Sequence, residues 1–331
     1  MHILVIGAAG MVGRKLTAAL VKSGRLAGKQ IAAFTLADVV KPDEGLDGFS
    51  GKVTSVASDL STAGTSEQLV AGRPDVIFHL AAIVSGEAEK DFDKGYRINM
   101  DGTRYLLEAI RQEGLRSGAY LPRLVFTSSI AVFGAPFPEA IADEYFTTPL
   151  TSYGTQKAIC ELLLNDYSRK GFVDGVGIRL PTIAVRPGKP NAAASGFFSN
   201  ILREPLAGQE AVLPVSKDVR HWFASPRAAV GFLVHAAEMD SSQLGWRRTV
   251  SAPGLSATVG EEIEALRRVA GDRIVGLIKE VPDPAIMKIV EGWPRNFDTR
   301  RAIGLGFKAE SSMDEIIKIH IDDELGGKIG G

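Results

Sequence analysis

Three glycines directly after a short apolar run are the feature that most restricts how this chain can fold. The run His2-Ile-Leu-Val-Ile6 is rich in β-branched residues, as in a buried parallel strand. Gly7, Gly10 and Gly13 follow it, and an amphipathic pattern typical of a helix comes next. A strand, a glycine turn and a helix in this order predict a dinucleotide-binding loop.

Each glycine has a role in such a loop. Gly7 allows the tight turn, Gly10 lets the backbone approach a pyrophosphate, and Gly13 lets the helix pack closely on the strand. Met11 and Val12 then begin the helix, whose free N–H groups face the phosphates. The spacing departs by one residue from the G-x-G-x-x-G form.

An acidic residue ends the second expected strand. This strand covers residues 31–36 and runs to Asp38. A carboxylate there accepts hydrogen bonds from the adenosine ribose and repels a 2′-phosphate, which favours NAD over NADP. Arg14 and Lys15 follow the glycine loop, and their charges would weaken that preference.

Strands and helices continue to alternate up to about residue 180. Further strands are expected over 76–80, 124–127 and 175–180, with a helix over 99–111. This alternation predicts a doubly wound parallel sheet, whose ligands bind beyond the carboxyl ends of its strands. The glycine loop and the pairs Ala81-Ala82 and Ser128-Ser129 fall at such ends.

The pattern becomes irregular after Pro181. Helical patches return over 226–237, 260–269 and 312–320, and they indicate a smaller cap that completes a cleft. The expected domains are therefore a dinucleotide-binding domain over 1–180 and a substrate-binding cap over most of 181–331. Residues 220–236 are left open, because they could also pack back on the sheet.

Tyr153 and Lys157 supply candidate acid–base chemistry. Residues four apart on a helix share one face, so both side chains can point at the same small volume. A nearby ammonium favours the phenolate and lowers the pKa of the phenol. Tyr153 could then take a proton from an alcohol while a hydride leaves the same carbon.

The composition excludes several classes of partner. A net charge of −1 gives no reason to expect nucleic acid or an anionic membrane as a partner. Cys160 is the one cysteine, so an intrachain disulfide is impossible and a reducing compartment is expected. No apolar stretch is long enough to span a bilayer, and the N-terminal run is too short for a signal peptide. A cytoplasmic location and a site without metal are expected.

Together, these motifs resemble the extended short-chain dehydrogenases/reductases, the NAD-dependent epimerase/dehydratase family. The resemblance covers nearly the whole chain and is strongest over residues 1–185. It rests on the glycine loop and on further motifs in the family's order, which are Asp38, Asp59-Leu60, His79-Leu-Ala-Ala82, Asn99-x-x-Gly102-Thr103, Ser128-Ser129 and Tyr153-x-x-x-Lys157. It implies a Rossmann-type α/β fold with a smaller C-terminal cap.

The resemblance also implies residue roles. Ser129 would orient the reacting oxygen, Tyr153 would be the base, and Lys157 would hold the ribose and lower the tyrosine pKa. The remaining NAD contacts would come from Asp59 and Leu60 at the adenine, Ala81 and Ala82 beside the nicotinamide, Ser128, and Asn99, which would support the active-site helix.

Departures from the family pattern narrow the reaction. Ile130 and Ala131 follow Ser129, whereas dehydratases of the family carry Asp-Glu beside this position. Nucleotide-sugar enzymes of the family usually have Asn three residues after the arginine of the sixth strand, and this chain has Thr182 there. Arg186 and Arg220 are cations able to hold a carboxylate through paired hydrogen bonds, and either could instead form a structural ion pair.

The combination is most similar to the D-erythronate dehydrogenase branch of the family. This likeness is most specific over 128–134, 179–190 and 220–226. It implies NAD-dependent oxidation of D-erythronate to 2-dehydro-D-erythronate, with Thr182, Arg186 or Arg220, and Ser85 as candidate substrate contacts. It also suggests homodimers built from helices around 92–116 and 153–170.

Two alternatives stay open. A nucleotide-sugar 4-epimerase would use the same tyrosine and serine but would keep its NAD tightly bound through a full cycle. A non-catalytic dinucleotide sensor would need neither Tyr153 nor Lys157, so the presence of both argues against it.

Overall fold

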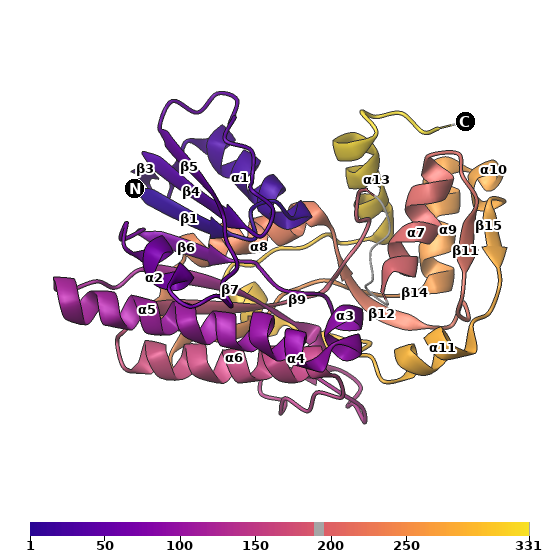
Figure 1. The fold of residues 1–331 in the computed structure, drawn as a ribbon. Helices are drawn as coiled ribbons and strands as arrows, with labels where there is room; N and C mark the ends of the chain where they lie inside the picture. The colour runs from indigo at the N-terminus through magenta and orange to yellow at the C-terminus, as the bar shows by residue number, and fades with distance from the viewer. Residues whose placement is uncertain (189–194, 331) are drawn as a thin grey trace.

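A seven-stranded parallel sheet forms the centre of the larger part of the molecule (Figure 1). The computed structural model describes residues 1–188 and 195–330. The strands follow the order β13 (Thr249–Ser251), β9 (Asp174–Leu180), β7 (Arg123–Ser129), β6 (Val76–His79), β1 (His2–Ile6), β4 (Ala33–Asp38) and β5 (Lys52–Ala57). The doubly wound parallel sheet predicted from the sequence is therefore confirmed.

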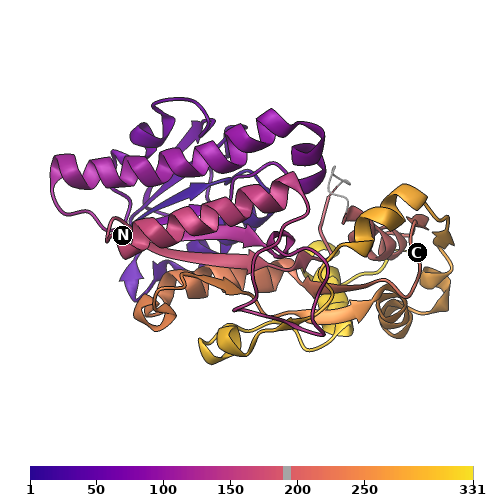
Figure 2. The same cartoon turned by 90° about the horizontal axis from the view of Figure 1, so that it is seen from below.

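Helices cover both faces of this sheet, because its apolar strands are buried on both sides. One face packs against α1 (Met11–Ser23) and α8 (Pro226–Glu238). The opposite face packs against α2 (Thr65–Val70), α5 (Gly102–Ser117) and α6 (Ser152–Arg169). Figure 2 shows α5 and α6 side by side along this outer face.

The strand order places a crevice at the centre of the sheet. β1 lies between β4 and β6, and the chain winds outward from it in both directions. In an open parallel sheet, ligands bind beyond the carboxyl ends of the strands at such a reversal point. The segments after β6 and β7 begin there, with α3 (Ser85–Lys90), α4 (Phe92–Gly95), a π-helical turn (Tyr96–Asp101) and a 3₁₀ turn (Ile130–Val132).

The cap lies beside the carboxyl ends of the strands and has its own apolar core (Figure 1). Its three-stranded sheet has the order β10 (Thr182–Ile183), β12 (Arg220–Ala224) and β14 (Leu255–Thr258). The other cap elements are α7 (Gly196–Leu206), β11 (Ala211–Leu213), α9 (Val259–Ala270), α10 (Asp272–Val275), β15 (Ile278–Glu280), α11 (Pro284–Glu291) and α13 (Met313–Glu324).

The two parts interleave along the chain. The segment 220–236, left open by the sequence, divides between them, since β12 belongs to the cap sheet and α8 packs on the main sheet. β13 then returns to extend the main sheet beyond β9, and the sequence analysis did not identify this strand. The remaining elements are β2 (Arg25–Leu26), β3 (Lys29–Gln30), β8 (Ile141–Ala142), a 3₁₀ turn (Ser241–Leu244), β16 (Phe297–Asp298) and α12 (Arg300–Gly304).

Candidate active site

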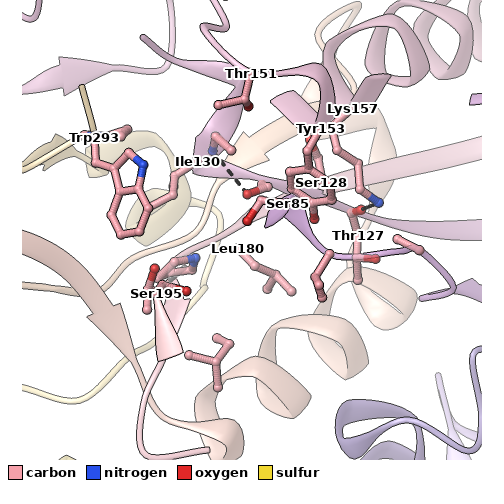
Figure 3. A pocket seen from close by; sticks show the side chains of 18 of the residues that line it. Ser85, Thr127, Ser128, Ile130, Thr151, Tyr153, Lys157, Leu180, Ser195 and Trp293 are labelled. Atoms are coloured by element: carbon pink, nitrogen blue, oxygen red, sulfur yellow. Dashed lines mark hydrogen bonds between the residues drawn. The ribbon is translucent and has the colours of Figure 1, made fainter. Parts of the chain in front are cut away.

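A cavity of about 340 Å³ lies between the carboxyl ends of the central strands and the cap. It is the only one of the two main cavities that contains Tyr153. Figure 3 shows Tyr153, Lys157, Ser128 and Ser85 on one side of it, with Trp293 and Ser195 of the cap opposite. Ten residues selected from the sequence line the cavity, namely Met11, Val12, Ala82, Ser85, Ser128, Ser129, Tyr153, Lys157, Thr182 and Arg186.

The start of α6 fixes the position of Tyr153. Thr151 caps this helix, and its Oγ1 accepts a hydrogen bond from the Gly154 amide at 3.1 Å. A Cβ at Gly154 would lie 2.1 Å from the Ala131 carbonyl oxygen, so only glycine allows the helix this close to the turn after β7. The approach brings Tyr153 beside Ser129, because that turn begins with Ser129 as its cap.

Lys157 lies one turn further along α6 and is buried. Its Nζ donates to the Thr127 carbonyl at 2.8 Å and lies 5.7 Å from the centre of the Tyr153 ring. The side chain is thus held between β7 and the tyrosine. The shared face expected from the four-residue spacing is present.

Burial is the main cause of the pKa shifts of Tyr153 and Lys157. It raises the pKa of Tyr153 to about 12, and hydrogen bonding with Ser129 opposes this rise. Burial lowers the pKa of Lys157 to about 8, while Cys160 and Glu161 oppose that fall. The net shift of the Tyr153 pKa in the protein alone is therefore upward, because desolvation of the phenolate is the largest effect.

The adjacent serines of β7 point to different partners. Ser128 Oγ donates to Glu161 Oε1 at 2.5 Å, and Glu161 is paired in turn with Arg179 at 2.8 Å. Ser129 Oγ accepts from the Ala131 amide at 3.1 Å. Its own hydroxyl proton can be donated to Tyr153, whose pKa the hydrogen bond with Ser129 lowers, or to a reacting oxygen.

The glycine loop has the shape that a dinucleotide needs. Gly7 has φ +92°, and a Cβ there would lie 2.7 Å from the Ala81 amide nitrogen. A Cβ at Gly13 would lie 2.2 Å from the Gly7 carbonyl oxygen. Gly10 precedes α1 without a capping side chain, so the first N–H groups of the helix are open to a phosphate. These residues fit a dinucleotide cofactor.

The residues expected at the adenosine end lie around this loop. Asp38 ends β4, and its carboxylate accepts from the Ala9 amide at 3.0 Å. The Arg14 guanidinium donates to the carbonyl of the same residue, Ala9, at 2.9 Å. Lys15 pairs with Glu324 of α13. Neither cation of the loop forms an ion pair with Asp38.

Four further cofactor candidates lie near the sheet but do not line the cavity, namely Asp59, Leu60, Ala81 and Asn99. Asp59 follows β5 and accepts from the Ser61 amide at 2.8 Å, and Leu60 is buried beside it. Asn99 is buried, accepts from the Ile83 amide at 2.9 Å and donates to Gln156 of α6 at 2.8 Å. It thereby links the segment after β6 to the helix that carries Tyr153.

The structure separates the two candidate arginines. Arg186 lines the cavity, whereas Arg220 does not. Arg220 is partly exposed, pairs with Glu261 at 3.2 Å and donates to the Ser256 carbonyl at 3.1 Å. The geometry thus gives Arg220 the structural ion pair that was its alternative role.

Arg186 is held in place through its backbone. Its amide donates to Ser199 Oγ at 3.0 Å, and its carbonyl accepts from Arg203 at 2.7 Å. Its guanidinium donates to Ser195 Oγ at 2.8 Å. Burial lowers the pKa of Arg186, and the Arg203 charge lowers it further. Lys189 and Pro190, which end the motif quoted for this segment, lie outside the described residues.

Several cavity residues escaped the sequence analysis. His221, Trp293 and Pro294 line the wall that the cap contributes. His221 follows Arg220 in a motif that was noted only for its arginine. Trp293 and Pro294 come from the loop after α11, more than a hundred residues from Tyr153, and no local pattern connects them to the site.

The described residues form neither a metal-binding cluster nor a membrane-spanning helix. Across residues 1–188 and 195–330, no cluster of three or more His, Cys, Asp or Glu side chains could hold a metal ion. Within the same ranges, no helix is long and apolar enough to cross a membrane.

Known proteins are similar to this chain in sequence and in fold. A D-erythronate dehydrogenase from Cupriavidus necator is 46% identical over 98% of both chains. A D-erythronate dehydrogenase from Haemophilus influenzae is 42% identical and covers 98% of this chain and 100% of its own. A crystal structure described as the nucleoside-diphosphate-sugar epimerase from Agrobacterium tumefaciens is 68% identical, with a TM-score of 0.97 over 99% of this chain and 95% of its own.

More distant structures share the fold alone. A GalE-like L-threonine dehydrogenase from Cupriavidus necator is 23% identical, with a TM-score of 0.83 over 98% of this chain and 99% of its own.

The NAD dependent epimerase/dehydratase family matches residues 3–243, which include the glycine loop and the tyrosine–lysine pair. The chain therefore belongs to the NAD dependent epimerase/dehydratase family.

Proposed function

We propose that this protein is an NAD-dependent dehydrogenase that oxidises the C2 hydroxyl of D-erythronate to give 2-dehydro-D-erythronate. The observation that carries the proposal is a half-buried guanidinium, Arg186, in the same small cavity as Tyr153 and Ser129. A cation placed there suits a short acid whose carboxylate is close to the hydroxyl that reacts. The two relatives named D-erythronate dehydrogenase, which match over the whole chain, support the same substrate.

Each catalytic side chain has one task. The Ser129 hydroxyl holds the reacting oxygen, and Tyr153 removes its proton. Lys157, fixed by the Thr127 carbonyl, keeps a positive charge beside the tyrosine and stabilises the phenolate. The bound nicotinamide supplies the hydride acceptor.

A nicotinamide dinucleotide is the cofactor of this family, and we infer that the preferred form is NAD. The Asp38 carboxylate is placed at the end of β4 by the Ala9 amide, where it would accept from ribose hydroxyls. The same charge would repel a 2′-phosphate. Lys15 cannot readily offset this repulsion, because it is paired with Glu324.

The remaining cofactor contacts follow from the loop geometry. Gly7, Gly10 and Gly13, with Met11 and Val12, would hold the pyrophosphate at the start of α1. The adenine would lie near Asp59 and Leu60, and the nicotinamide near Ala81, Ala82 and Ser128. Asn99 would act indirectly, through its bonds to the Ile83 backbone and Gln156.

On the substrate side, the carboxylate would be held by Arg186. The guanidinium is a planar fork that matches a carboxylate in geometry and charge. Ser85, at the start of α3, and Thr182, in β10, line the same cavity and would hold the other oxygens of the acid.

A nucleotide-sugar 4-epimerase is the second candidate, because the 68% identical crystal structure carries that description. The position at which nucleotide-sugar enzymes of the family place an asparagine is Thr182 in this chain. The volume of about 340 Å³ is near the lower end for ligand pockets, which suits a small acid better than a nucleotide sugar.

One assay separates the candidates. The purified protein is mixed with free NAD and a panel of three- to six-carbon aldonic acids, and NADH is followed by its absorbance. A dehydrogenase accumulates NADH in proportion to the acid consumed, with D-erythronate the best substrate. An epimerase forms no net NADH and interconverts UDP-glucose and UDP-galactose, whereas a sensor binds NAD and does neither.

We further infer a homodimer formed through the outer face of α5 and α6. Leu162 of α6 is 68% exposed and Phe92 of α4 is 59% exposed, so both apolar side chains are accessible to a second copy of the chain. Leu162→Asp should convert the dimer to a monomer in light scattering. Unchanged mass would remove this face as the interface.

A reducing compartment such as the cytoplasm suits the single, buried thiol of Cys160.

A further inference from the structure

A threonine and a histidine of the cap form a hydrogen-bonded pair in the cavity wall. Thr182 belongs to β10 and His221 to β12, which are neighbours in the three-stranded sheet. Thr182 Oγ1 lies 2.7 Å from His221 Nε2. Both residues line the cavity that contains Tyr153.

The other ring nitrogen of His221 fixes where its proton lies. Nδ1 is 2.9 Å from the Pro294 carbonyl oxygen, which can only accept a hydrogen bond. Nδ1 therefore carries the proton. Burial lowers the pKa of His221 to about 4, the Pro294 carbonyl opposes this, and Arg186 lowers it further. The ring is neutral at pH 7, and Nε2 is a bare acceptor.

This protonation determines the direction of the bond to Thr182. A hydroxyl has one proton to donate and two lone pairs that accept. Thr182 gives its proton to Nε2, so its oxygen has only acceptor capacity left for a ligand. The ring cannot easily turn to reverse this, since Phe198 is stacked on it at 5.0 Å with an angle of 2° and Trp293 lies 5.3 Å away.

We propose that Thr182 and His221 form an acceptor-only subsite that selects a hydroxyl of the substrate other than the one oxidised. The inference rests on the proposed function, because D-erythronate carries such hydroxyls at C3 and C4. The cavity then offers two opposite polarities, with a guanidinium donor at Arg186 and an acceptor at Thr182. An anionic or carbonyl oxygen placed against Thr182 would face lone pairs without a proton between them.

The first test uses the unaltered enzyme and substrate analogues. We measure kcat/KM for D-erythronate, for its 3-deoxy and 4-deoxy analogues, and for acids with fluorine at the same carbons. Loss of the selected hydroxyl leaves the Thr182 acceptor unpaired, so one deoxy acid should be worse by about 5- to 150-fold. Fluorine cannot donate a hydrogen bond. The fluoro acid at that carbon should therefore be no better than the deoxy acid.

Three variants test the pair itself. Thr182→Val should lower kcat/KM for D-erythronate and abolish its advantage over the deoxy acid, whereas Thr182→Ser should restore that discrimination. His221→Phe keeps an aromatic ring against Phe198 but removes Nε2. The Thr182 proton is then free to donate, so the fluoro acid should become better than the deoxy acid. Thermal unfolding identifies any variant that does not fold, in which case the analogue series with the unaltered enzyme decides.

The outcomes separate the two proposals. Equal kcat/KM for D-erythronate and both deoxy acids would overturn the subsite and leave the dehydrogenase intact. A fluoro acid that matches D-erythronate in the unaltered enzyme would show that Thr182 donates, which also overturns it. If none of the acids is oxidised, the proposed function fails and the subsite fails with it.

Discussion

Replacement of Arg186 by methionine gives the sharpest test of how the acid is bound. Methionine has a similar length and fills the buried space, but it removes the charge and every donor. The backbone bonds of residue 186 to Ser199 and Arg203 do not depend on the side chain, so the segment should keep its position. The change therefore affects the carboxylate contact more than the fold.

The expected magnitude follows from the loss of hydrogen bonds to a charged group. A hydrogen bond to a charged group contributes about 1.5–3 kcal/mol, and each 1.4 kcal/mol is a factor of ten. The loss in kcat/KM for D-erythronate should be on the order of ten- to two-hundredfold, mainly through KM. The KM for NAD should stay nearly constant. Arg186→Lys keeps the charge without the planar fork, so its kcat/KM for D-erythronate should lie between those of the unaltered enzyme and Arg186→Met.

Arg220 provides a matched control. It is also an arginine of the cap, but it pairs with Glu261 outside the cavity. Arg220→Met should leave the KM values for D-erythronate and for NAD within about twofold of those of the unaltered enzyme, because an exposed ion pair contributes about 0–1 kcal/mol. Initial rates of NADH formation at varied D-erythronate supply all of these values. A normal KM in Arg186→Met, or a larger defect in Arg220→Met, would refute the assignment.

Further predictions concern the base, the cofactor and the glycine loop. Tyr153→Phe should lower kcat by roughly 10²–10⁴ while NAD affinity, measured by fluorescence titration, is retained. Because burial raises the pKa of Tyr153 to about 12, log kcat/KM should rise with pH between 7 and 10, and a flat profile would exclude this tyrosine as the base. Asp38→Asn should narrow the ratio of kcat/KM for NAD to that for NADP, and an unchanged ratio would remove Asp38 from cofactor selection. Gly13→Ala places a Cβ 2.2 Å from the Gly7 carbonyl oxygen, so it should destabilise the protein by about 1–3 kcal/mol in urea unfolding and weaken NAD binding. Wild-type stability with normal NAD binding would show that the loop can move to accept the methyl group.

The parts of the fold that sequence predicted are those formed by nearby residues. The strand before Gly7 and the helix after it depend on local periodicity and backbone freedom, and both are present in the structure. The closeness of Tyr153 and Lys157 depends only on helix geometry. In each case, the information is contained in fewer than about twenty consecutive residues.

The elements that sequence missed depend on distant partners. β13 has three residues and becomes a strand because it pairs with β9, about 70 positions earlier in the chain. The direction in which the pKa of Tyr153 shifts also depends on distant residues. Spacing indicates which charge is close, but the desolvation that dominates comes from the packing of the whole cavity.

The sequence by itself determined the alternation of strands and helices up to about residue 180, the dinucleotide loop, and the side chains that can move a proton. Only the tertiary structure decided which arginine faces the reacting groups, because Arg186 and Arg220 are chemically identical and differ in what packs around them. It also brought His221 against Thr182 and the Pro294 carbonyl, contacts that span 39 and 73 positions of the chain. The direction of a hydrogen bond depends on the partners of both atoms, and here those partners meet only after the cap has folded onto the sheet.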